Sequence, residues 1–253
     1  MDIRAIETLL HTHIIGRHII GFDSVNSTND KIRVLIAEGA NEGLVLSADE
    51  QTDGRGRFQR TWVSTPRTNL LFSVFLQPAL SDDQIPLLNF AASLAVARTL
   101  RLYPGLAAEL RWPNDVFVHG KKISGILSER TGNAVIIGIG VNVNQDIFPA
   151  ELPYATSCRI ETGMNLDRGR MFHLLLRELD DMYQRIIHDG FAGVMEEWRA
   201  ACRMVGTSIT LSAADRAIHG TVARIDDDGA LVIRDEFGVE RVCYEGDVSL
   251  KRV

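Results

Sequence analysis

Residues 109–144 read ELRWPNDVFVHGKKISGILSERTGNAVIIGIGVNVN, and much of the architecture follows from this segment. Short apolar runs alternate in it with three turn signals, namely Pro113-Asn114-Asp115, His119-Gly120 and Thr131-Gly132-Asn133. Apolar runs joined by such turns are typical of neighbouring antiparallel strands. The segment therefore predicts an antiparallel meander.

Helices and strands are expected on either side of this block. Apolar spacing predicts helices at residues 3–14, 28–38, 86–100, 168–188 and 191–202, and strands at residues 18–25, 43–51 and 69–78. From Gly206 onward, short alternating runs separated by turn residues predict a small all-β module, which we expect to be a compact barrel. The sequence thus predicts an α+β domain over residues 1–205 and a β-barrel over residues 206–253.

Composition limits the class of protein. The 253 residues are 45% hydrophobic and 24% charged, as in ordinary globular proteins, and they contain neither a membrane-spanning run nor a signal peptide. A net charge of −6 argues against general affinity for nucleic acid. Cys158, Cys202 and Cys243 lie far apart without CxxC spacing, which indicates free thiols and disfavours zinc. We expect a cytoplasmic protein that binds neither DNA nor membranes.

A basic, glycine-rich loop follows the second predicted strand and reads EQTDGRGRFQRTW at residues 50–62. Guanidinium groups bind carboxylates and phosphates in a two-pronged way, and glycines let a backbone close around a ligand. A solvated loop is the alternative, but the residue types favour anion binding. The segment is not a Walker A loop, because GK[ST] is absent. We name residues 50–62 the arginine loop.

Three further polar clusters each have a structural and a functional interpretation. Ser27-Thr28-Asn29 suits a helix cap, and its hydroxyls also suit a neutral polar ligand. Lys121 and Lys122 precede a predicted strand that contains Gly125, where the glycine allows close approach of a ligand and a lysine beside it offsets negative charge. GIGVNVN at residues 138–144 lacks the sixth-position glycine of a dinucleotide-binding loop, so it indicates a buried strand with asparagines at its polar end.

The four clusters together resemble the biotin protein ligase family. NSTN (26–29), the arginine loop, RWPNDVFVHGKKISGIL (111–127) and GIGVNVN stand in that family's order and approximate spacing. The likeness spans residues 18 to 145, and the C-terminal module is similar to the family's SH3-like appendage. It implies a class II synthetase-like biotin/lipoate ligase domain, with a mixed or antiparallel sheet packed with helices. We expect the short, monofunctional type, without an N-terminal DNA-binding domain.

The resemblance implies an ATP-dependent ligase that needs Mg²⁺. Biotin and ATP give biotinyl-5′-adenylate and pyrophosphate, and the biotinyl group passes to a lysine of a biotin carboxyl carrier protein. The biotin carboxylate and the triphosphate are both anions, so cationic groups and Mg²⁺ must offset their repulsion. The metal ligands stay unassigned, and we expect a monomer or a weak homodimer.

The resemblance also implies roles for individual residues. Hydroxyl and amide groups suit the ureido ring of biotin, cations suit its carboxylate, and glycines permit closure. The residues implied for biotin are Ser27, Thr28, Gln51, Gly54, Arg55, Lys122 and Gly125. The residues implied for the nucleotide are Arg57, Trp62, Asn114 and Asn142. The residues implied for catalysis are Lys122, Arg55, Arg57 and Asp115, with Asp115 helping to deprotonate the incoming lysine.

The arginine loop departs from the family at one point. Phe58-Gln59 stand where family members usually have Arg-Gly. Losing a glycine and a cation should make the loop stiffer and less basic. We hypothesise slower loop exchange or weaker retention of the adenylate.

Three other functions are weighed against this interpretation. A lipoate ligase or octanoyltransferase shares the fold class, but it needs no polar groups for a ureido ring. A non-catalytic biotin- or nucleotide-binding regulator would not need Lys122 and both arginines. A dinucleotide-dependent oxidoreductase is disfavoured because the glycine fingerprint fails.

Overall fold

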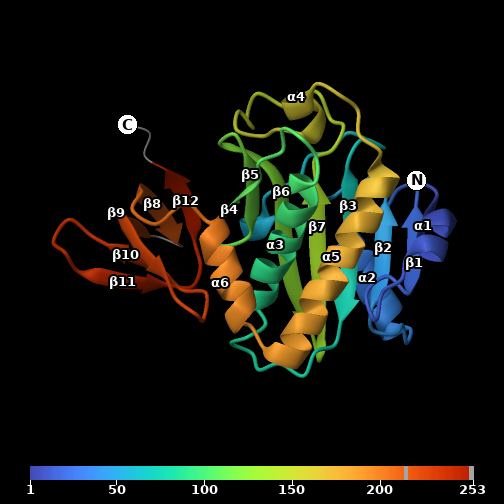
Figure 1. Cartoon of the computed structure of the whole chain (residues 1–253), viewed down its shortest axis with the longest axis horizontal. Coiled ribbons are helices and arrows are strands. Elements are labelled where there is room, and N and C mark those ends of the chain that lie inside the picture. The colour runs from blue at the N-terminus through green and yellow to red at the C-terminus, as the bar shows by residue number, and fades with distance from the viewer. Residues whose placement is uncertain (214–215, 251–253) are drawn as a thin grey trace.

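The structure is a computed structural model that describes residues 1–213 and 216–250, and it contains two sheets and their flanking helices (Figure 1). The helices are α1 (Ile3–Leu9), α2 (Thr28–Ala37), η1 (Arg57–Gln59), α3 (Leu87–Arg101), α4 (Cys158–Thr162), α5 (Arg168–Asp189) and α6 (Ala192–Ala201). The strands of the larger sheet are β1 (His18–Phe22), β2 (Leu44–Ala48), β3 (Leu70–Leu76), β4 (Glu109–Arg111), β5 (Asp115–Val118), β6 (Lys121–Thr131) and β7 (Ala134–Val141). Those of the smaller sheet are β8 (Ser208–Ala213), β9 (Arg216–Ile225), β10 (Leu231–Arg234), β11 (Glu240–Cys243) and β12 (Asp247–Leu250).

The larger sheet is mixed, with the strand order β1-β2-β3-β7-β6-β5-β4. The predicted meander is confirmed, because β4 to β7 pair antiparallel with their neighbours in the chain. β1 and β2 are parallel. The connection between them contains α2, which returns the chain to the same end of the sheet, as a parallel pair requires.

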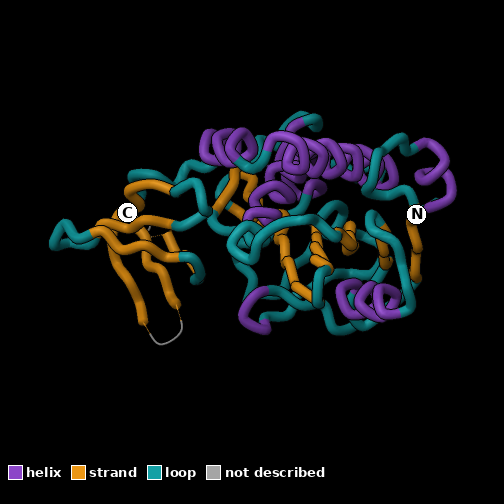
Figure 2. The backbone as a smooth tube through the Cα atoms, turned by 90° about the horizontal axis from the view of Figure 1, so that it is seen from below, coloured by secondary structure: helices purple, strands orange, loops and turns teal. Residues whose placement is uncertain are grey.

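Helices cover the larger sheet on both faces. In Figure 2, α2 lies on one side of the strands and the long helix α5 lies on the other. α3 is buried along most of its length, as its apolar sequence predicts, and it packs against α5, α6 and β6. The ring of Trp198 in α6 meets Phe90 of α3 edge-on at 4.7 Å, and its indole N–H donates to Ser93 Oγ over 2.9 Å. This helical layer fixes one face of the sheet.

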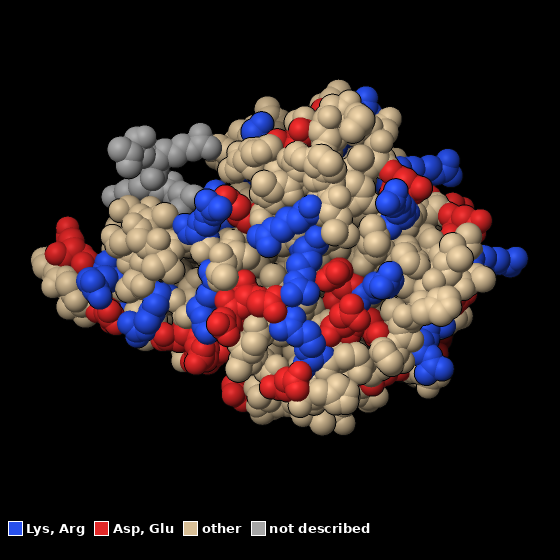
Figure 3. Space-filling view, viewed as in Figure 1, with Lys and Arg blue, Asp and Glu red and all other residues tan. Residues whose placement is uncertain are grey.

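Acidic and basic side chains intermingle on the face seen in Figure 3. Arg98 of α3 pairs with Glu178 and Glu197, and Arg185 pairs with Glu197 as well. Opposite charges at such short range largely cancel at a distance, and physiological salt screens the remaining field beyond about 8 Å. This face therefore carries mixed charge instead of a basic patch.

The smaller sheet is antiparallel, with the order β11-β10-β9-β8-β12. The barrel that the sequence predicts is an open sheet in the described residues, because β11 and β12 do not pair there. The strands of the module are otherwise those expected, with β12 added. No helix in the described ranges 1–213 and 216–250 is long and apolar enough to cross a membrane.

The two sheets belong to one continuous hydrophobic core. Ile209 and Leu231 of the smaller sheet lie in the same cluster of buried residues as α3 and α5. Trp112 donates its indole N–H to the Gly229 carbonyl over 2.8 Å. A Cβ on Gly229 would lie 3.0 Å from both Leu87 and Phe90, and its φ is +82°, so this turn needs glycine. The boundary between residues 205 and 206 stays a prediction.

Two local features differ from the sequence prediction. The first helix ends at Leu9, five residues earlier than its apolar spacing predicts, and α4 was not predicted. Leu10 is already extended, and the backbone N–H groups of the residues that follow donate to the buried carboxylate of Asp180 in α5. A distant tertiary contact therefore overrides the local helical pattern.

We expect Trp112→Phe to destabilise the protein as a whole. The change leaves the Gly229 carbonyl without its donor in a buried place, which costs about 1–3 kcal/mol of unfolding free energy. Urea unfolding would measure the loss. Tyr244→Phe is the control, because it removes a hydrogen bond to Asp228 at the surface and should leave the midpoint unchanged. Equal midpoints for Trp112→Phe and the unaltered chain would contradict this account.

Candidate active site

A cavity of about 250 Å³ lies over the larger sheet, where β6 and β7 meet the arginine loop. The structure brings to this cavity every site residue predicted from the sequence except Gly54, which packs against Gln51 and Trp62 behind it. The predicted residues that line it are Ser27, Thr28, Gln51, Arg55, Arg57, Trp62, Asn114, Asp115, Lys122, Gly125 and Asn142. Their roles toward a ligand stay predictions.

Two glycines form the floor of the cavity. Gly125 of β6 and Gly140 of β7 face each other in the sheet register. A Cβ on Gly140 would lie 2.5 Å from Cε2 of Trp62, and one on Gly125 would lie 3.0 Å from Cζ3. The indole ring therefore rests directly on the backbone of two strands. Its buried Nε1 lies against β7, where a Cβ on Gly140 would be 2.9 Å away, and has no hydrogen-bond partner among the described residues.

One end of the cavity is polar and uncharged. The Oε1 atom of Gln51 accepts from the backbone N–H of Thr28 at 2.7 Å and from its hydroxyl at 2.9 Å. The carboxamide is thereby oriented with its N–H₂ group as the remaining donor. Ser27 is the N-cap residue of α2, yet its side chain makes no capping hydrogen bond. The Ser27 hydroxyl therefore does not cap the helix, and it is available to a ligand.

Ser73 supports this polar end and was missed by the sequence analysis. Its buried hydroxyl lies 2.7 Å from Thr28 Oγ1 and 2.6 Å from Asn29 Oδ1. A Cβ on Gly138 would lie 2.4 Å from Asn29 Oδ1, so this strand position also needs glycine. A serine within the apolar run NLLFSVFL was the available signal.

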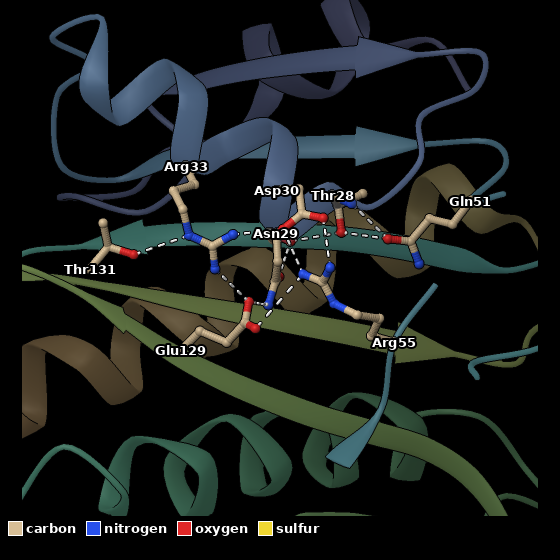
Figure 4. Close-up of polar contacts among 9 residues, drawn as sticks. Thr28, Asn29, Asp30, Arg33, Gln51, Arg55, Glu129 and Thr131 are labelled. Atoms are coloured by element: carbon tan, nitrogen blue, oxygen red, sulfur yellow. Dashed lines mark hydrogen bonds and ion pairs between the residues drawn. The ribbon is translucent and has the colours of Figure 1, made fainter. Parts of the chain in front are cut away.

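Arg55 anchors the arginine loop to α2 (Figure 4). Its two terminal nitrogens lie 2.7 and 2.6 Å from the carboxylate oxygens of Asp30, and Glu129 lies 3.8 Å away. Arg33 completes the network through both carboxylates. Hydrogen bonding to Arg55 lowers the pKa of Asp30. The family resemblance implies Arg55 for the carboxylate of biotin, and in this structure its guanidinium pairs with the carboxylates of Asp30 and Glu129.

Arg57 has a different environment. Its Nη1 atom donates to Asn114 Oδ1 at 3.3 Å, and it forms no ion pair with any described residue. Burial lowers the pKa of this guanidinium, with only longer-range compensation from acidic groups such as Asp115. A partly desolvated cation without a carboxylate partner is a strong site for an anion.

Lys122 and the two asparagines complete the cationic end. The ammonium of Lys122 lies 2.7 Å from Asp115 Oδ1 and 5.8 Å from the Trp62 ring. Asn114 donates to the Ile126 carbonyl, which fixes its amide. Asn142 donates to the Thr156 carbonyl at 3.0 Å, while its Oδ1 has no partner among the residues described. Asn142, which the resemblance implies for the nucleotide, therefore lines the cavity with an acceptor that has no partner among the described residues.

The arginine loop forms a closed hairpin. Trp62 N–H donates to the Gly54 carbonyl at 2.8 Å, and Gly56 N–H donates to the Arg60 carbonyl at 2.7 Å. At the tip, Phe58 and Gln59 have φ values of +54° and +57°. Residues other than glycine, asparagine and aspartate rarely adopt this left-handed backbone conformation. Arg60 then reaches Asp247 of β12, so the smaller sheet also holds the loop.

The fold and the site can now be compared with known proteins. The biotin/lipoate A/B protein ligase family matches residues 21–146, and the biotin protein ligase C-terminal domain matches residues 206–251. The bifunctional ligase/repressor BirA of Bacillus spizizenii is 32% identical over 249 residues, covering 95% of this chain and 76% of that protein. The biotin–[acetyl-CoA-carboxylase] ligase of Mycobacterium tuberculosis is 35% identical, covering 88% and 85%.

Solved structures agree with these relatives. The biotin protein ligase of Aquifex aeolicus in complex with biotin and ATP superposes with a TM-score of 0.83 at 28% identity, covering 94% of this chain and 100% of that one. The fold is that of the biotin/lipoate ligase class. The match to the C-terminal domain and the sequence relatives identify one family within this class. The chain belongs to the biotin protein ligase family.

We expect Gly140→Ala to weaken biotin binding. The added methyl group would lie 2.5 Å from an indole carbon, so the Trp62 side chain would have to move away from the sheet. Overpacking of this kind costs about 1–3 kcal/mol, and a loss of that size in binding free energy corresponds to a loss of affinity of about 5- to 150-fold. Titration calorimetry with biotin would measure it. Gly193→Ala in α6 is the control, because its new methyl group would make only an ordinary contact, 3.5 Å from Arg185.

Proposed function

We propose that the chain attaches biotin to a lysine of a biotin carboxyl carrier protein, using ATP and passing through biotinyl-5′-adenylate. One observation carries the proposal: a single cavity has a neutral hydrogen-bonding end at Thr28 and Gln51 and a cationic end at Arg57 and Lys122. Biotin has the matching polarity, with an uncharged ureido ring at one end and a carboxylate at the other. Family membership supports the same activity.

In the first step, a carboxylate oxygen of biotin attacks the α-phosphorus of ATP. The new P–O bond replaces the bond to pyrophosphate, which leaves with the electron pair. Both reactants are negative, so the barrier includes their repulsion. Arg57 and Lys122 supply positive charge at the cationic end that offsets this repulsion. Orientation adds to this effect, because the hydrogen-bonded ureido ring holds the carboxylate at one place.

In the second step, the amine of the carrier lysine attacks the acyl carbon of the adenylate. The bond from carbon to the phosphate oxygen breaks, and AMP leaves with the electron pair. Asp115 is the candidate acceptor for the proton that the amine must lose. Its carboxylate holds the Lys122 ammonium at 2.7 Å before any ligand binds. We infer that Lys122 turns to the phosphate when the adenylate forms, which frees Asp115 for this role.

Mg²⁺ accompanies ATP in this proposal and neutralises charge on the phosphates. Mg²⁺ in nucleotide sites is usually held by one or two carboxylates together with substrate phosphates. The site fits this pattern, because two carboxylates, those of Asp115 and Asp247, line the cavity. The protein ligands of the ion stay unassigned.

The partner in this proposal is a carrier domain with an accessible lysine. Relatives named biotin–[acetyl-CoA-carboxylase] ligase support a carboxylase as its source. Three buried, unpaired cysteines support a reducing compartment, and we place the reaction in the cytoplasm. A monomeric or weakly dimeric state, and the lack of DNA and membrane binding, stay predictions.

The test is incubation with biotin, Mg-ATP and a biotin carboxyl carrier domain. Mass spectrometry should show one biotin added to the carrier. Lys122→Ala should slow this transfer about 100-fold or more, since it removes a cation that stabilises the developing charge. Lys121→Ala is the matched control, because the neighbouring side chain is exposed and does not line the cavity. Full activity of Lys122→Ala would contradict the proposed catalytic role of Lys122.

Ligand choice gives a second prediction. Biotin should raise the thermal unfolding temperature, whereas lipoate should not, because its aliphatic dithiolane offers no oxygen acceptor to the Gln51 amide N–H₂ group, the donor that the contacts with Thr28 leave unused. Gln51→Leu should reduce the biotin-induced shift. A larger shift with lipoate than with biotin would transfer the proposal to lipoate ligation.

A further inference from the structure

Phe58 occupies an unusual position for an aromatic side chain. It stands at the tip of the arginine loop with 52% of its surface exposed, so burial gives it little stabilisation. Its φ of +54° is left-handed, which costs an ordinary L-residue about 1–2 kcal/mol. Neither hydrophobic burial nor backbone preference accounts for phenylalanine here. Its contacts must supply the reason.

The contact that Phe58 makes is with Arg57. The guanidinium carbon of Arg57 lies 4.9 Å from the centroid of the Phe58 ring, within the range of a cation–π interaction. The other polar contact of this guanidinium is the 3.3 Å hydrogen bond to Asn114. Arg57 is thus held by an aromatic ring and an amide, both of them uncharged.

Arg55 and Arg60, the other two arginines of the loop, have charged partners, unlike Arg57. Arg55 is matched by Asp30 and Arg60 by Asp247, so each has a carboxylate that cancels much of its charge. A carboxylate beside Arg57 would compete with an incoming anion in the same way. An aromatic ring orients a guanidinium without neutralising it, and the interaction is stronger where the cation is desolvated.

We propose that Phe58 is a positioning residue that holds the Arg57 guanidinium at the cavity, ready for the anionic part of biotinyl-5′-adenylate. The proposal rests on the function proposed above and adds a residue that the family resemblance does not assign. Phe58 lines the same cavity as Thr28 and Gln51, and its ring contacts the Arg57 guanidinium, so its contribution concerns the carboxylate and phosphate part of the ligand. Its loss should therefore weaken retention of the adenylate.

The experiment measures release of chemically prepared biotinyl-5′-adenylate by stopped-flow, which requires no turnover. Phe58→Leu should speed dissociation about 3- to 30-fold, the range expected for a partly desolvated cation–π contact. Phe58→Tyr keeps the ring and should restore slow release. Phe237→Leu is the matched control, since the same change at an 81% exposed phenylalanine remote from the cavity should have no effect.

A double-mutant cycle with Arg57→Ala separates positioning from a general effect on the fold. If Phe58 acts through Arg57, Phe58→Leu should have little further effect once the guanidinium is absent. An unchanged rate for Phe58→Leu, or an equal loss in the Arg57→Ala background, would overturn the proposal. Pyrophosphate release by the unaltered chain with biotin and Mg-ATP tests the proposed function separately, and a failure there leaves the adenylate measurements interpretable.

Discussion

The close approach of Trp62 to the sheet is the constraint on which the site depends. Gly125 and Gly140 lie opposite each other, and a methyl group on either would meet the indole. Side chains normally stand on both faces of a sheet and would fill this space. Because they are missing here, the arginine loop can fold down onto β6 and β7. The cavity is then enclosed between a backbone floor and a hairpin.

The three arginines of the hairpin differ in their partners. Arg55 ties it to α2, and Arg60 ties it to β12, so two elements far apart in the chain hold its two sides. Arg57, at the tip, has no carboxylate partner among the described residues. All three arginines of the loop line the cavity, and Arg57 is the one among them that no described carboxylate pairs with. The predicted role of Arg55 toward the ligand stays a prediction.

Much of the fold was predictable from the sequence, and so were many of the residues that line the cavity. The strands of residues 109–144 were predictable because turn residues mark their ends, and the central helices because their apolar patterns are long. The end of the first helix was not predictable, because Asp180 lies 167 residues from His13 and captures the backbone there. The partner of Arg55 was missed for the same reason, since residue types show that arginine suits an anion without showing which anion. Ser73 was hidden as a single polar residue within an apolar strand.

The shared core has a consequence for how this chain can change over evolutionary time. The turn that ends at Gly229 sits against Leu87 and Phe90, at the start of α3, and accepts a hydrogen bond from Trp112. A substitution that enlarges any of these contacts must be matched by another on the opposite side of the junction. The smaller sheet is therefore not an interchangeable appendage. It should be inherited together with the first turn of α3, and a chimaera would have to exchange both pieces at once.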